Sequence, residues 1–184
     1  MEQTSVQKLA RVLRVMVMAV FVCNLIALPV VPSMVYWYAN QGELEYRLTI
    51  GNSLLNIWLH GLSRVWKNSP YTFMLALFLV VCGICTAAIL WQGKQVLGTI
   101  LRGEPFVQNN AKSLKRAAVC CFIISGMALV RLVWGLADYR NIGPLLSYNA
   151  LFVPIFLMGG LLFMVMSALF RQAAELKAEN DLTI

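Results

Sequence analysis

The sequence is poor in charge, holds one histidine and has no cysteine outside its apolar runs, and each shortage argues against a class of protein. Charged residues make up 12% of the 184 residues, whereas a soluble domain carries about 25%. With His60 as the single histidine, a zinc site is not expected. A secreted disulfide framework is not expected either, because all five cysteines lie within apolar runs: Cys23, Cys82, Cys85, Cys120 and Cys121.

The apolar residues of the sequence form long blocks that contain few charges. The mean hydropathy is +0.72, and four blocks have the ~20 residues that match the apolar thickness of a bilayer. We therefore predict an all-α membrane protein, a four-transmembrane-helix bundle that forms one domain over residues 1–184. Pro29 and Pro32 are expected to kink or end the first helix. The expected spans are about residues 12–36, 72–92, 117–137 and 149–171.

The basic residues predict how the chain is threaded. Lysine and arginine favour the cytoplasmic side of short loops, and the net charge of +7 lies beside apolar spans rather than on one polar face. Direct nucleic-acid binding is therefore not predicted. With the N-terminus inside, ten basic residues face the cytoplasm and four face outward, so both termini are predicted to be cytoplasmic. The inner ones are Lys8, Arg11, Arg14, Lys94, Arg102, Lys112, Lys115, Arg116, Arg171 and Lys177; the outer ones are Arg47, Arg64, Lys67 and Arg140.

The connection between the first two spans, residues 39–70, is the longest and contains an amphipathic helix. Its apolar residues recur at helical spacing along one side, and its polar residues lie mostly opposite. Such a helix can lie flat on the membrane or cap the bundle, and both structural roles are favoured over a ligand lid. The apolar stripe consists of Leu55, Trp58, Leu59, Leu62 and Trp66.

The second cytoplasmic connection has the signals of a tight helical hairpin. Span two is predicted to continue as a helix to about Leu101. Gly103 can end it in a left-handed conformation, and Pro105 prevents the helix from continuing. Asn109 or Asn110 is expected to cap the next helix. A basic collar for the lipid headgroups follows, made of Lys112, Lys115 and Arg116.

Arg131 is the unexpected charge within an apolar span. A charge at that depth is costly unless it pairs or reaches water, and Asp138, seven residues on, shares its helix face. The simpler interpretation is a structural arginine that pairs or reaches outward. The functional alternative is an outer polar pocket formed by Arg131 and Asp138, which would suit a small transporter subunit or a binder of lipophilic or anionic ligands.

A second alternative is a membrane thiol oxidoreductase, suggested by the Cys82–Cys85 pair together with Cys120 and Cys121. This hypothesis is disfavoured because a thiol in apolar surroundings is inert and no second cysteine pair lies in an outer loop. We predict no enzymatic activity and no cofactor. The small residues Gly83 and Gly159–Gly160 are expected to support helix packing, either within one chain or in a homo-oligomer.

Two stretches, "GEPFVQNNAKSLKR" and the terminal "AAELKAENDLTI", resemble the bacterial membrane proteins of domain of unknown function 2975. The loop matches the family pattern at its glycine, its Pro-Phe pair, an asparagine and Leu114. It departs at Val107, where the family often has a capping threonine or serine, so capping is expected to shift to Asn109. The tail matches over Glu179–Ile184.

The resemblance implies a four-helix protein of the bacterial inner membrane, without known catalytic residues and often encoded beside a small helix-turn-helix repressor. The leading hypothesis is a non-enzymatic regulatory or signalling protein that engages a cytosolic partner, namely that helix-turn-helix regulator by family association. Its contact surface would combine the second connection with the cytoplasmic tail, residues 172–184. The candidate residues are Gly103, Pro105, Phe106, Asn109, Asn110, Glu179, Asn180, Asp181, Leu182, Thr183 and Ile184.

Overall fold

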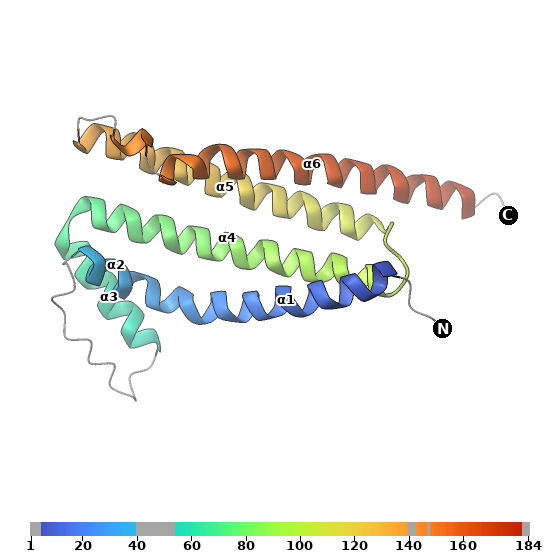
Figure 1. Ribbon diagram of the computed structural model, residues 1–184, viewed down its shortest axis with the longest axis horizontal. Coiled ribbons are helices and arrows are strands. Elements are labelled where there is room, and N and C mark those ends of the chain that lie inside the picture. Colours follow the sequence, from blue (N-terminus) through green and yellow to red (C-terminus); the bar gives the residue numbers. More distant parts are fainter. Residues whose placement is uncertain (1–4, 40–53, 140–142, 147, 182–184) are drawn as a thin grey trace.

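The computed structural model describes residues 5–39, 54–139, 143–146 and 148–181. These residues form helices and a few turns, and no strand occurs among them. Figure 1 shows the long helices lying roughly side by side. The elements are α1 (Ser5–Ala27), η1 (Leu28–Val30), α2 (Val31–Ala39), α3 (Leu54–Asn68), α4 (Pro70–Leu101), α5 (Gln108–Tyr139), η2 (Gly143–Leu146) and α6 (Tyr148–Asp181), in which η denotes a 3₁₀ helix.

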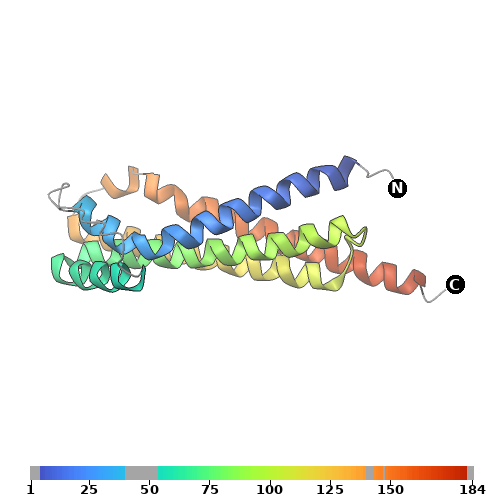
Figure 2. The ribbon, with the colours of Figure 1, turned by 90° about the horizontal axis from the view of Figure 1, so that it is seen from below.

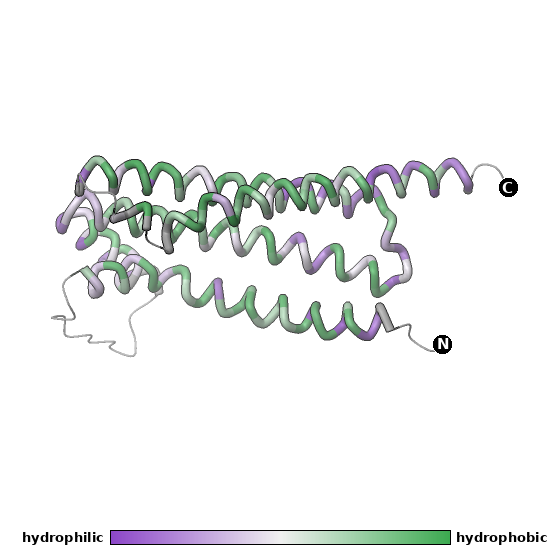
Figure 3. Tube along the Cα trace, turned by 45° about the horizontal axis from the view of Figure 1, so that its top comes forward, coloured by the Kyte–Doolittle hydropathy of each residue, from purple (hydrophilic) through white to green (hydrophobic). Residues whose placement is uncertain are grey.

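Four helical segments are long and apolar enough to cross a membrane, which confirms the predicted fold class and indicates a multi-pass membrane protein. Figure 3 shows hydrophobic residues along the middle of these segments and hydrophilic residues toward their ends. Many large apolar side chains point outward, as a lipid solvent requires. The segments are Gln7–Ala39, Pro70–Leu101, Gln108–Asp138 and Ala150–Asn180.

The first span is interrupted where its prolines predict. Pro29 lies within η1, and Pro32 lies in the first turn of α2. Proline has no backbone N–H to donate and its ring obstructs the preceding turn, so α1 gives way to one turn of 3₁₀ helix before α2 continues the span.

The four spans are arranged in a row in which α1 packs against α4, α4 against α5, and α5 against α6. Burial agrees with this order. In α5, 33% of the most apolar 18-residue segment is buried, whereas only 6% of the corresponding segment is buried in the first span and in the last. The described parts of both terminal helices end at the same end of the molecule, which also carries the α4–α5 turn (Figures 1 and 2). α2 and α3 lie at the opposite end.

Polar and small residues connect the neighbouring helices. Ser125 Oγ donates to the Val153 carbonyl at 2.9 Å, and Ser167 Oγ donates to the Ala111 carbonyl at 2.7 Å, so both ends of the α5–α6 interface carry a hydrogen bond. A Cβ atom on Gly160 would lie 2.6 Å from the Phe122 ring. Small residues at such contacts let two helices approach closely when hydrophobic contrast with lipid is absent.

α3 confirms the predicted amphipathic helix between the first two spans, and it packs against α2, η1 and α4. Val65 is fully buried with Val35 and Ala76. Leu59 and Trp66, which the sequence places on the apolar side, are 50% and 70% exposed. The packed face is therefore centred on residues 61 and 65, because the helix turns its smallest residue toward α2. Of the two structural roles, the contacts support capping of the bundle.

Gly61 allows α3 to pack closely against α2. A Cβ atom there would lie 2.8 Å from the backbone nitrogen of Ser33, so we expect Gly61→Ala to destabilise the protein by about 1–2 kcal/mol through overpacking. The thermal midpoint of the detergent-solubilised protein measures this. Gly159→Ala is the matched control, because no atom lies within 4 Å of its Cβ position. Equal midpoints for the two variants would contradict the close contact.

Candidate functional site

The α4–α5 turn begins as the sequence predicts. α4 ends at Leu101, and Gly103 adopts a positive φ of 80°, a conformation that a residue with a Cβ atom rarely takes. The backbone N–H groups of Gly103 and Glu104 donate to the carbonyls of Ile100 and Thr99, both at 3.1 Å. These bonds satisfy carbonyls that would otherwise be left open at the helix end.

The predicted asparagine cap is wrong. α5 begins at Gln108, directly after Val107, so Asn109 and Asn110 already lie within the first turn of the helix. Asn110 instead reaches back across the hairpin: its Nδ2 donates to Thr99 Oγ1 at 2.6 Å and to the Pro105 carbonyl at 2.7 Å. The Asn110 side chain therefore links the end of α4 and the turn instead of capping the first turn of α5.

Burial removes Asn110 from the candidate partner surface. Its exposed fraction is 0%, whereas Gly103, Phe106 and Asn109 are exposed and Pro105 is half-buried. Asn110 therefore acts inside the turn, and the remaining candidate residues of the turn form its surface. No feature of the single sequence distinguishes the two adjacent asparagines.

The turn touches α6, which continues past it. The rings of Phe106 and Phe170 lie 5.8 Å apart between centroids, and Figure 1 shows the end of α6 projecting beyond the turn. The helix extends to Asp181, well beyond the predicted end of the fourth span near residue 171. Leu182, Thr183 and Ile184 lie outside the described residues.

The projecting part of α6 is exposed on all sides from Glu175 to Asn180. Arg171 Nε and Glu175 Oε1 form an ion pair at 2.9 Å, which supports the helix locally but is worth little in water. Leu176 is 61% exposed. The candidate residues Glu179 and Asn180 are thus exposed at the same end of the molecule as the turn.

The other predicted site lies toward the opposite end of α5. The Arg131 guanidinium carbon lies 5.0 Å from the centroid of the Phe78 ring, and the Phe78 ring contacts Phe152 of α6. Arg131 is half-buried and Asp138 is exposed. An arginine over an aromatic face is an attractive contact within a protein. Arg131 and Asp138 line neither of two cavities that lie between α1 and α4.

The cysteines remain separate thiols. All five are free; Cys85 and Cys121 are buried, and Cys82 and Cys120 are half-buried. Within the described ranges, no group of three or more histidine, cysteine, aspartate or glutamate side chains is placed to hold a metal ion.

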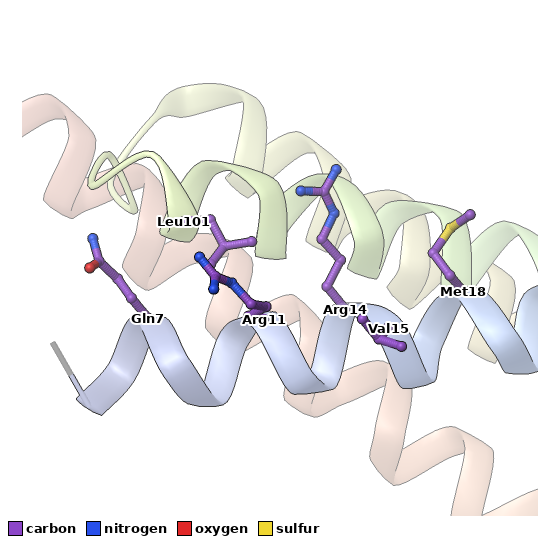
Figure 4. Close-up of a pocket in the computed structure, with 6 residues that line it drawn as sticks. All are labelled: Gln7, Arg11, Arg14, Val15, Met18 and Leu101. Carbon is purple, nitrogen blue, oxygen red and sulfur yellow. The ribbon is translucent and has the colours of Figure 1, made fainter. Parts of the chain in front are cut away.

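A basic cleft that the sequence did not reveal lies between α1 and α4 at the end with the termini. It consists of two neighbouring cavities of about 510 and 270 Å³, and Arg14 borders both. Figure 4 shows Arg11 and Arg14 reaching from α1 toward α4. Spacing along α1 does place these arginines on adjoining faces, but only tertiary packing brings them opposite Lys94 and Arg102.

Comparison with known proteins agrees with the resemblance seen in the turn and tail. The family model described as Protein of unknown function (DUF2975) matches residues 62–184. Neither the curated proteins nor the solved structures gave a match. The matched region contains α4, α5 and α6 entire, together with the buried Asn110 and the projecting end of α6. This chain therefore belongs to the DUF2975 family.

Proposed function

We propose that this protein is a non-enzymatic regulatory or signalling component of the bacterial inner membrane, with both termini in the cytoplasm, and that it engages a cytosolic protein. The orientation is supported by the ten basic residues that the threading assigns to the end with the termini. By family association, the partner is a helix-turn-helix regulator encoded beside it.

The observation that carries the proposal is the projecting end of α6. The end of α6 extends a helix that the bundle has already nucleated, so it can remain helical in water and present its side chains to a partner. Here Glu175–Asn180 stay helical although they are exposed. Leu176 offers an apolar contact on this projection, and the exposed Phe106 lies nearby through its contact with Phe170.

Deletion of Glu179–Ile184 tests the proposal. We expect the deletion to abolish co-purification with the neighbouring regulator and to change expression of a reporter under that regulator, while the protein still accumulates in the membrane. Unchanged co-purification and unchanged reporter expression would refute the proposal.

A point variant separates the tail from a general effect on the bundle. Leu176→Ala is expected to weaken the association about tenfold, which corresponds to ~1.4 kcal/mol. Leu162→Ala is the matched control, because Leu162 is 65% exposed on the same helix, against 61% for Leu176, but lies within the predicted fourth span, residues 149–171. Equal association of the two variants with the regulator would argue against the tail as the contact.

The two alternatives remain predictions. A transporter subunit or ligand binder would use the pocket around Arg131 and Asp138, and a thiol oxidoreductase would use Cys82 and Cys85. Arg131→Leu tests the first through ligand binding, and replacement of both cysteines tests the second through thiol exchange.

A further inference from the structure

The basic cleft between α1 and α4 gathers four cations from segments far apart in the sequence. Arg11 and Arg14 come from α1, and Lys94 and Arg102 come from α4. No aspartate or glutamate lines either cavity. Like charges held around one space repel each other unless a counter-charge lies between them. The positive charge of the lining therefore favours an anionic ligand.

Polar groups beside these cations fit a phosphate group. Gln95 and Asn109 line the smaller cavity together with Arg14 and Lys94, and their amide groups are hydrogen-bond donors. Guanidinium groups bind phosphate oxygens through paired N–H donors, and an ammonium adds a point charge. The cleft thus offers both kinds of contact to a single phosphate.

The side of the cleft that lies farther along α1 is apolar. Val15 and Met18 line the larger cavity there, and the rings of Phe21 and Trp91 meet at 5.8 Å between α1 and α4. Lys94 Nζ lies 4.7 Å from the Trp91 ring centroid. Indole rings and basic side chains gather at the level of the lipid headgroups. A soluble phosphate would leave this apolar lining without a partner, whereas a lipid would cover it with its acyl chains.

We propose that the cleft between α1 and α4 binds the phosphate headgroup of an anionic phospholipid, with the acyl chains following the apolar side of α1. The phosphate lies among Arg14, Lys94 and Arg102, and Arg11 supplies further positive charge at the rim. This site lies between α1 and α4, away from the end of α6, and shares only Asn109 with the candidate partner surface.

The test compares two pairs of charge removals in the full purified chain. Phosphatidylglycerol is titrated against the detergent-solubilised protein, and bound lipid is counted by native mass spectrometry. We expect Arg14→Gln/Lys94→Gln to weaken phosphatidylglycerol binding at least about tenfold. Lys8→Gln/Lys177→Gln is the matched control: it removes two exposed charges from the same end of the molecule that line neither cavity. We expect this control to bind as the parent protein does.

Equal weakening by the two double variants would overturn the proposal, because diffuse surface charge would then account for the binding. Unchanged binding by Arg14→Gln/Lys94→Gln would overturn it as well. Phosphatidylcholine and inorganic phosphate identify the source of the phosphate. We expect each to bind at least about tenfold more weakly than phosphatidylglycerol, and inorganic phosphate that displaces the lipid at equal concentration would overturn the lipid assignment. A thermal midpoint equal to that of the parent shows that each variant is folded.

Discussion

Asn110→Ala is expected to destabilise the protein by about 1–3 kcal/mol, since it removes the buried donor that two partly buried acceptors share. Asn110 Nδ2 is shared between Thr99 Oγ1 and the Pro105 carbonyl, and its side chain is fully buried. The substitution therefore opens the link between the end of α4 and the start of α5. The drop in thermal midpoint of the detergent-solubilised protein measures the effect.

Asn109→Ala is the control for this prediction. Asn109 is the adjacent asparagine in the same helical turn, but it is exposed and does not take part in the two hydrogen bonds. Surface substitutions usually change stability by less than about 0.5 kcal/mol. Trypsin cleavage after the exposed Arg102 gives a second measurement and should accelerate only in Asn110→Ala. Similar midpoints and cleavage rates for both variants would mean that the two Asn110 hydrogen bonds do not hold the turn.

Gly160→Leu is the second large effect that we expect, with a loss of about 2–3 kcal/mol from overpacking of the α5–α6 interface. Even a Cβ atom on Gly160 would lie 2.6 Å from Cε1 and 2.8 Å from Cδ1 of the Phe122 ring. A leucine must push the two helices apart, and this strains the nearby Ser125 hydrogen bond to Val153. Thermal unfolding and the detergent concentration needed to unfold the protein should both report the loss.

Gly159→Leu tests whether the effect belongs to that face of α6. No atom lies within 4 Å of a Cβ built on Gly159, so a leucine there points into lipid and should be tolerated. A destabilisation equal to that of Gly160→Leu would show that the helix face is assigned wrongly. Gly160 and Gly83 already contact Phe122 and Leu28 of the same chain, so both glycines serve helix packing within one chain.

The fold could be predicted from sequence where a signal is local. Apolar length sets the number of spans, since a bilayer has a fixed thickness. Gly103 ends α4 because a glycine readily takes positive φ there. The prolines interrupt the first span for an equally local reason. The start of α5 differs from the prediction because the Asn110 side chain bonds across the turn to Thr99 and Pro105, and these contacts outweigh its local capping preference.

Most of the candidate site lay beyond such reasoning. Hydropathy cannot tell a lipid-facing side from a helix-facing one, because lipid chains are as apolar as leucine. Gly159 and Gly160 therefore look alike in sequence, as do Asn109 and Asn110, although one of each pair is enclosed by the protein.

The sequence by itself determined that this chain has four apolar helices, where the apolar part of each lies, and which of their ends carry the positive charge. Only the tertiary structure decided that α1 lies beside α4, which places Arg11 and Arg14 opposite Lys94 and Arg102 around one cleft. The physical reason is that helix formation and membrane insertion depend on neighbours along the chain, whereas the surroundings of a side chain depend on neighbours in space.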